Sequence, residues 1–529
     1  MEVPLLVNDF LRRAVKLYAD GEAVVDGAQR FTYAEYGARC YQLGHALLSL
    51  GVKRGDRVGI LSPNSHHFLE AFYGTASIGA VLVPLNYRLI ADDFEYCLKH
   101  AGASVILADS DLTAAVEAIR PNLPDLEHLI VARYGDAPLT DGWTDWEELI
   151  SGRPTTPPAD PGLDENDLVS INYTSGTTAR PKGVMLTHRN FYVNAYNYIS
   201  HFGITHDDVD MWTLPLFHCN GWGGPYALTA MGAKHVIVRA PTDAEMYEVI
   251  EREGVTFACM APAVLARILE YPNKAKHQIK TKPRFVIAGA PPPLTFVKRL
   301  EEELGWTFIQ IYGLTETAPI LTIAEVKPHL NARGDQVIAI KGRAGQEGVG
   351  VEIRVLGEAG DDVPWDDETV GEVCARGNMV FKGYWNQPEE TAKAIVDGYF
   401  HTGDLATINR DGYINIVDRA KDVIISGGEN VSSIEVEDTL YKHPAVLEAA
   451  VIGVPHEQWG ETPLAAVVLR AGAQATDREL IAFCRDRMAH FKAPTRIEFV
   501  GALPRTATGK LKKFELREQY WAGKTRRVN

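Results

Sequence analysis

The sequence lacks any long hydrophobic run. No apolar stretch in its 529 residues approaches the roughly 18–20 residues that a membrane-spanning helix needs. Residues 1–9 also lack the basic start and the long apolar centre of a secretory signal peptide. We therefore expect a cytoplasmic protein without a transmembrane segment.

Cysteine is scarce and is not clustered. The six cysteines contain no C-x-x-C metal pattern and no closely spaced pairs: Cys40, Cys97, Cys219, Cys259, Cys374 and Cys484. This pattern excludes a disulfide framework and fits a reducing compartment.

Positive charge is in deficit, with a formal net charge of −16. This charge argues against nucleic acid or an anionic membrane surface as the main partner. Local basic residues can still bind small anions such as ATP or coenzyme A. With 46% apolar and 23% charged residues, the chain is typical of a globular protein, and its length predicts two or more domains.

Short apolar runs alternate with amphipathic helical patterns along much of the chain. Helices are predicted at residues 35–50 and 67–79, and strands at 57–61, 80–84, 235–239, 257–261 and 285–288. Such alternation predicts parallel sheets covered by helices. Residues 343–418 are richer in short strands and Gly/Asp turns. We place a domain boundary at 418–421, which gives domains 1–418 and 419–529.

A loop rich in hydroxyl groups, glycine and lysine lies between two apolar runs. It reads Tyr-Thr-Ser-Gly-Thr-Thr-Ala-Arg-Pro-Lys-Gly over residues 173–183. Backbone amides in a glycine-containing turn bind anions, and Lys182 adds a compact positive charge. The spacing is not that of the Walker loop. A phosphate-binding loop is favoured over a solvated linker.

Four further motifs follow in order: Tyr312–Thr317 (YGLTET), Tyr399–Asp404 (YFHTGD), Asp418–Asp422 (DRAKD) and Pro504–Lys510 (PRTATGK). With the loop, they make the chain resemble the adenylate-forming superfamily. This group includes acyl-CoA synthetases, firefly-type luciferases and the adenylation domains of peptide synthetases. Two positions depart from its patterns: Ala179 stands where relatives often carry glycine, and Ile425 where some carry lysine.

The resemblance implies an α/β fold in two domains. It implies a large N-terminal domain of parallel-sheet αβ layers with a small β-barrel-like subdomain, and a small mobile α+β C-terminal domain. Lys421 would be the hinge between the two domains.

The resemblance also implies a site for ATP, Mg2+ and coenzyme A. The residues expected to bind ATP or coenzyme A are Thr174, Ser175, Gly176, Thr177, Thr178, Lys182, Gly289, Ala290, Pro291, Gln310, Tyr312, Thr315, Asp404, Arg419, Gly427 and Gly428. Thr174 and Glu316 would lie near the magnesium ion. From the residues alone, Glu316 could equally lie on a solvated turn.

Catalytic roles are implied for Lys510, Lys421 and His218. Adenylation creates negative charge as pyrophosphate leaves, and the Lys510 ammonium would stabilise that charge. Without the resemblance, a lone lysine near the end of a chain is more commonly solvated. Acetylation of Lys510 by a lysine acetyltransferase would remove its charge.

The substrate is indicated by residues 214–222 (LPLFHCNGW). His218, Cys219 and Trp222 are expected to line the acyl site, and Trp222 looks like the gate tryptophan of long-chain fatty acyl-CoA synthetases. Amino-acid-activating relatives carry an aspartate just after the phenylalanine that matches Phe217. Its absence here indicates an acid with an uncharged tail, either a fatty acid of short, medium or long chain or an aryl acid.

The resemblance therefore implies an ATP-dependent carboxylic acid–CoA ligase with a small-molecule acid and coenzyme A as partners. A homodimer is a further expectation. A carrier-protein-loading enzyme and a luciferase-like oxygenase would share every motif. A non-enzymatic nucleotide-binding regulator should have lost Lys510 or Glu316, and both are present.

Overall fold

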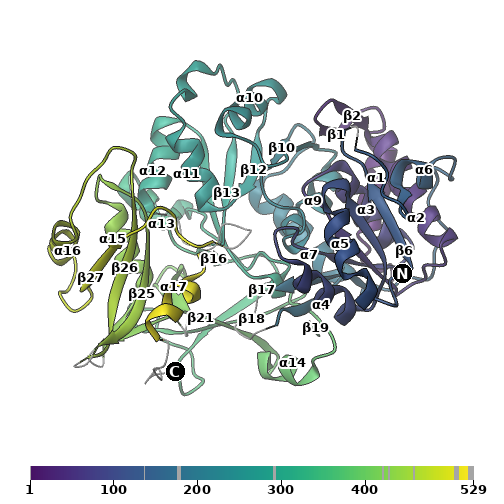
Figure 1. Ribbon diagram of the computed structural model, residues 1–529. Coiled ribbons are helices and arrows are strands. Elements are labelled where there is room, and N and C mark those ends of the chain that lie inside the picture. Colours follow the sequence, from purple (N-terminus) through teal and green to yellow (C-terminus); the bar gives the residue numbers. More distant parts are fainter. Residues whose placement is uncertain are drawn as a thin grey trace.

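The computed structural model describes residues 2–135, 137–174, 180–289, 293–419, 422–426, 429–456, 459–505 and 511–521. Within them the strands form four sheets that are surrounded by helices (Figure 1). Among the described residues, no helix is both long enough and apolar enough to cross a membrane.

One sheet carries the predicted phosphate loop between two of its strands. In spatial order its strands are β19 (Gly383–Tyr384), β9 (Lys182–Thr187), β8 (Leu168–Thr174), β4 (Val81–Pro84), β3 (Arg57–Leu61), β5 (Ala103–Asp109), β6 (His128–Ala132) and β7 (Thr144–Asp145). The pairing is parallel from β8 to β7, whereas β9 and β19 are antiparallel to their neighbours.

A second sheet carries the motif Tyr312–Thr317, which is predicted to bind the nucleotide, at the end of β14. We call this segment the nucleotide motif. Its order is β16 (Gln346–Glu347), β15 (Thr322–Ile323), β14 (Thr307–Tyr312), β13 (Arg284–Ile287), β12 (Phe257–Met260), β10 (Val209–Trp212), β11 (Lys234–Ile237), β1 (Glu22–Asp26) and β2 (Gln29–Thr32). The strands from β14 to β1 pair in parallel. The predicted α/β class is therefore confirmed.

Helices fill the space between these sheets and cover their outer faces. One apolar cluster joins both sheets to α1 (Asn8–Leu17), α2 (Tyr33–Ser49), α3 (His66–Ser77), α7 (His188–Phe202) and α9 (Gly224–Met231). The outer face of the first sheet packs on α4 (Ala91–Ala101) and α5 (Thr113–Ile119). The outer face of the second packs on α10 (Asp243–Glu253), α11 (Pro262–Glu270) and α12 (Leu294–Glu303).

Local sequence signals set several helix ends. The predicted helix 35–50 is α2, which starts earlier because Thr32 and Glu35 form a capping box. α10 begins with the same device, Thr242 with Glu245, and ends at Gly254 in the left-handed conformation. Two further short helices are α6 (Trp146–Ile150) and α13 (Asp335–Lys341). Turns of 3-10 helix lie at Ser110–Leu112, Arg120–Asn122, Lys274–Lys276, Thr315–Thr317 and Pro328–Leu330.

The third sheet is antiparallel and corresponds to the predicted small β subdomain. Its strands are β17 (Val351–Leu356), β18 (Gly371–Gly377), β21 (Tyr399–Ile408) and β20 (Ile395–Val396), with β22 (Ile414–Arg419) paired to β21. The helix α14 (Pro388–Ala394) precedes β20.

The fourth sheet has its own apolar core. It contains β24 (Glu429–Val431), β23 (Ile424–Ser426), β26 (Gly460–Leu469), β25 (Val446–His456) and β27 (Arg496–Phe499), with helices α15 (Ser433–Tyr441), α16 (Asp477–Arg485) and α17 (Lys513–Trp521). It lies beside α12 and far from α1 and α2 (Figure 1), and Arg470 contacts Glu270 at 2.6 Å. Residues 420 and 421 lie outside the described part of the chain, so the boundary at 418–421 stays a prediction.

Candidate active site

Thr174 and Lys182 flank the predicted phosphate loop at its two ends. They lie opposite each other in the antiparallel pairing of β8 with β9. Lys182 Nζ lies 2.6 Å from Glu390 Oε2, on α14, and 4.8 Å from the ring centroid of Tyr384. Hydrogen bonds from Lys182 and Lys393 lower the pKa of Glu390 to about 2. The predicted residues Ser175, Gly176, Thr177 and Thr178 lie outside the described residues.

Tyr312, Asp404 and Arg419 come together although they lie in separate motifs. The Tyr312 hydroxyl, at the end of β14, donates to Asp404 Oδ2 at 2.8 Å. Asp404 is buried on β21 and lies opposite Arg419 of β22 in the sheet register. For Arg419 the structure describes the backbone and not the side chain. This geometry places an aromatic side chain and a buried carboxylate at the end of one strand.

Glu316 lies in the 3-10 turn after Tyr312 and is held by two contacts to one neighbouring segment. Its backbone carbonyl accepts from the amide of Phe381 at 2.7 Å, and Oε1 accepts from the Tyr384 hydroxyl at 3.0 Å. Burial and the adjacent Glu316 carboxylate raise the pKa of the Tyr384 phenol. The phenol therefore keeps its proton and donates to Glu316.

Gly313 allows the chain to fold back closely after Tyr312. A Cβ at this position would lie 1.5 Å from the carbonyl oxygen of Pro319 and 3.1 Å from the amide nitrogen of Leu321. Both are backbone atoms, so the close approach requires glycine.

Gln310 presents a buried hydrogen-bond acceptor without a partner. Its Nε2 donates to the carbonyl of Ile311 at 3.1 Å, whereas Oε1 is buried with no hydrogen bond within the described part of the chain. Buried polar atoms are rarely left unpaired, so the oxygen suits a ligand that donates a hydrogen bond. Gly289, at the end of the neighbouring β13, has a φ of +92°. The predicted Ala290 and Pro291 lie outside the described residues.

The predicted acyl segment, residues 214–222, ends in a single left-handed turn, α8 (Cys219–Trp222). The φ angles of Cys219, Asn220, Gly221, Trp222 and Gly223 are 46°, 50°, 57°, 56° and 74°. This conformation costs roughly 1–2 kcal/mol for each residue that carries a Cβ. Such strain persists only where surrounding contacts hold it, and it is concentrated at functional sites.

Buried amide side chains hold the turn. Asn220 Nδ2 donates to Ser170 Oγ at 3.1 Å, and Asn220 Oδ1 accepts from Asn172 Nδ2 at 3.1 Å. Asn194 Nδ2 donates to the carbonyl of Trp222 at 3.0 Å. Ser170 and Asn172 belong to β8, so the strand that leads to Thr174 also fixes the acyl segment.

The acyl segment also adjoins the segment that carries Glu316. The Cys219 thiol donates to the carbonyl of Thr315 at 3.8 Å, and burial, with a smaller effect of Glu316, raises the pKa of that thiol. Phe217 packs edge-on against Tyr87 with ring centroids 5.6 Å apart. Trp222 is 5% exposed, while His218 is partly exposed.

The structure thus places Lys182 and Glu316 beside Tyr384, Tyr312 beside Asp404, and Cys219 beside Thr315. Lys421, Gly427, Gly428 and Lys510 lie outside the described residues, and their roles stay predictions. The sequence argument missed Tyr384, Glu390 and the role of Asn220. For Asn220 a local signal existed, since Asn-Gly is a pair typical of positive φ angles. Tyr384 and Glu390 had no such signal, because their contacts with Glu316 and Lys182 join segments remote in sequence.

Two family models match the chain. The model described as AMP-binding enzyme matches residues 11–385, and that described as AMP-binding enzyme C-terminal domain matches residues 435–510. The chain therefore belongs to the AMP-binding enzyme family, the adenylate-forming superfamily. Within it, the chain lies in the CoA ligase branch, whose members are AMP-forming acid–thiol ligases.

Relatives and solved structures match over nearly the whole chain. The chain is 36% identical to 4-hydroxybutyrate–CoA ligase 2 of Metallosphaera sedula, over 98% of this chain and 94% of that protein. It is 35% identical to the peroxisomal trans-cinnamate:CoA ligase of Petunia hybrida, over 98% of this chain and 94% of that protein. The crystal structure of the anthranilate CoA ligase AuaEII with anthranoyl-AMP matches with a TM-score of 0.91 and 29% identity, covering 99% of this chain and 98% of that one.

Proposed function

We propose that this chain is an ATP-dependent carboxylic acid–CoA ligase. In the first half-reaction the acid attacks the α-phosphate of ATP, giving an acyl-adenylate and pyrophosphate. In the second, the thiolate of coenzyme A attacks the mixed anhydride, giving acyl-CoA and AMP. The observation that supports the proposal is the contact between Cys219 and Thr315, because it joins the segments proposed to bind the acid and the nucleotide.

The described residues suit a nucleotide. Asp404 would accept hydrogen bonds from the ribose hydroxyls, and Tyr312, which donates to Asp404, would lie against the adenine. The unpartnered Oε1 of Gln310 can accept from the exocyclic amine of adenine. Lys182 would leave Glu390 and bind the phosphates.

Oxygen donors of the kind that magnesium prefers are present. The Thr174 hydroxyl and the Glu316 carboxylate would hold Mg2+, which typically uses one or two carboxylates together with phosphate oxygens. A bound ion would neutralise charge on the phosphates. Lys510 would stabilise the charge that develops during adenylation, and rotation about Lys421 would bring Gly427 and Gly428 to the site for the second half-reaction.

We propose further that the acid has an uncharged tail. Phe217 and Trp222 are buried aromatic residues, and His218 and Cys219 occupy the positions where an aspartate would pair an ammonium group. A fatty acid is the first candidate and an aryl acid the second, and the names of relatives, such as butyrate–CoA ligase and benzoate–CoA ligase, include both kinds.

A substrate panel tests this proposal. Pyrophosphate release should be measured with short- to long-chain fatty acids, aryl acids and α-amino acids, each with and without coenzyme A. We expect fatty or aryl acids to exceed amino acids of similar size by about 100-fold or more in kcat/KM, because burying an unpaired ammonium costs several kcal/mol. Efficient activation of any free amino acid would refute the assignment of the pocket.

Trp222→Ala is expected to change the preference for acids more than the affinity for ATP. Removing the buried indole enlarges the acyl site, so longer or bulkier acids should gain in relative kcat/KM. Trp365→Ala is a matched control, because Trp365 is 54% exposed and lies in the connection between β17 and β18 of the third sheet. If the relative kcat/KM values of the acids were unchanged in Trp222→Ala, the acyl chain would not bind beside Trp222.

Tyr384→Phe is expected to raise the Mg2+ concentration needed for half-maximal adenylation about tenfold. The variant keeps the ring beside Lys182 but loses the hydrogen bond to Glu316, and a bond to a charged group contributes about 1.5–3 kcal/mol. Tyr399→Phe is the control, since the Tyr399 hydroxyl donates to a different carboxylate, Glu352. An unchanged Mg2+ requirement would show that Tyr384 does not position Glu316.

Loading of a carrier protein is the second candidate function, because it uses the same adenylation chemistry. Acyl transfer to a carrier protein in place of coenzyme A would reveal it. The cytoplasmic location, a homodimer and acetylation of Lys510 stay predictions, and some relatives are peroxisomal.

A further inference from the structure

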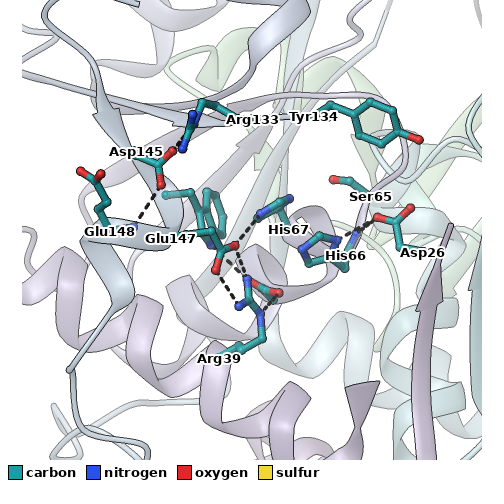
Figure 2. A network of polar contacts seen from close by, with 12 residues as sticks. Asp26, Arg39, Ser65, His66, His67, Arg133, Tyr134, Asp145, Glu147 and Glu148 are labelled. Carbon is teal, nitrogen blue, oxygen red and sulfur yellow. Dashed lines mark hydrogen bonds and ion pairs between the residues drawn. The ribbon is translucent and has the colours of Figure 1, made fainter. Parts of the chain in front are cut away.

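Away from the candidate active site, two adjacent histidines begin helix α3 beside a carboxylate of α6. His67 Nε2 lies 3.0 Å from Glu147 Oε1, and the rings of His66 and His67 have centroids 3.8 Å apart. One potential ligand atom from each of the three residues lies within 4.8 Å of the others. Figure 2 shows the three side chains converging.

His66 is oriented by a carboxylate on its far side. Its Nδ1 lies 2.8 Å from Asp26 Oδ2, which also accepts from the His66 backbone amide at 2.9 Å. Nε2 of this 6% exposed side chain makes no hydrogen bond with any residue that the structure describes, and it faces His67 and Glu147 (Figure 2). A carboxylate on one imidazole nitrogen with the other nitrogen available is the arrangement that supports histidine ligands of metals.

The charges of the cluster favour a cation. Asp26, Glu70 and Glu147 contribute three negative charges and Arg39 one positive charge, so the group carries −2 when the imidazoles are neutral. A divalent cation would neutralise the cluster.

Arg39 opposes a cation at this cluster, and it has a second carboxylate partner. Its guanidinium lies 2.6 Å from Glu147 Oε1 and also 2.6 Å from Glu70 Oε1. Glu70 is 1% exposed and also accepts from the Trp146 indole at 3.1 Å, so it is fixed. Arg39 Nη1 also donates to Glu147 Oε2 at 2.8 Å. Arg39 can therefore keep Glu70 and Glu147 Oε2 while Glu147 Oε1 turns to a metal.

We propose that His66, His67 and Glu147 form a binding site for a transition-metal dication of the Zn2+ class, with Asp26 orienting His66. Two imidazoles and one carboxylate suit Zn2+, Co2+ or Ni2+ and disfavour Mg2+ and Ca2+, which prefer oxygen donors. Metal–nitrogen bonds of about 2.0–2.1 Å require the three side chains to close by roughly 1 Å. A fourth position would be left for water. The bound ion would join α3 to α6, which lie far apart in the sequence.

Isothermal titration of chelator-treated protein with Zn2+, in excess Mg2+ and without ATP, tests the site. We expect one equivalent to bind, and Co2+ to give the visible absorption of a low-coordinate ion. His67→Gln and Glu147→Gln should weaken binding at least about tenfold, and Asp26→Asn about 10- to 100-fold. A rise in the melting temperature on adding Zn2+ should vanish in the same variants.

Two controls make the outcome decisive. His206→Gln removes a 61% exposed histidine and should leave binding unchanged. His401→Gln disrupts the other candidate cluster, Glu372, Cys374 and His401, and should also leave it unchanged. Circular dichroism of the metal-free variants checks their folding. Absence of binding by the unmodified protein, equal binding by a folded His66→Gln/His67→Gln double variant, or loss of binding in His401→Gln would overturn the proposal.

Discussion

Replacing Lys510 with alanine is expected to slow adenylation by about 10²–10³-fold while leaving the thioester step nearly unchanged. The lysine is proposed to stabilise the negative charge that develops as pyrophosphate leaves, and the loss of one preorganised electrostatic contact has an effect of this size. Adenylation is measured by pyrophosphate release, and the second step by the reaction of synthetic acyl-AMP with coenzyme A.

Lys524→Ala is a suitable control, because it removes a lysine outside the five motifs from the same end of the chain. It should leave both half-reactions unchanged. If a folded Lys510→Ala variant lost both half-reactions equally, the assignment of Lys510 to adenylation alone would be wrong.

Gly313→Ala is expected to destabilise the protein by about 4 kcal/mol or more, or to prevent folding. Its new methyl group would lie 1.5 Å from the Pro319 carbonyl oxygen, and only a shift of the backbone between Tyr312 and Leu321 could relieve that overlap. Large losses of this kind arise where backbone atoms clash in a packed region. Chemical denaturation measures the free energy of unfolding.

Gly501→Ala provides the matched control. Gly501 is exposed, and a Cβ there would meet nothing within 4 Å, so the free energy of unfolding should change by no more than about 0.5 kcal/mol. A Gly313→Ala variant with normal stability would show that the turn after Tyr312 is looser than this geometry implies.

The strands of the two large sheets could be predicted from local patterns. The apolar run 57–61 is β3, and the run 257–261 contains β12, because continuous apolar residues are what strands buried on both faces require. Helix α2 was also predicted, although its first residues depend on the capping box of Thr32 and Glu35.

The contacts within the site could be predicted only in part. The motifs indicated which residues would gather, and the structure shows Tyr312 hydrogen-bonded to Asp404. Local patterns could not reveal Tyr384 beside Glu316 or Glu390 beside Lys182, because these contacts join segments far apart in the sequence. Neither hydrophobic periodicity nor turn-forming residues indicate which side chain will contact a residue on another sheet.

If the left-handed turn at Cys219–Trp222 lines the acyl site, as we propose, it restricts how the acid specificity of this chain can be altered by directed evolution. Random replacement at these positions would mostly select against poor folding, because few side chains tolerate positive φ angles. Phe217 and Tyr87 face each other from backbone that lies outside the positive-φ region. A mutant library built on this pair would sample new pocket shapes at a smaller loss of stability than one built on the turn.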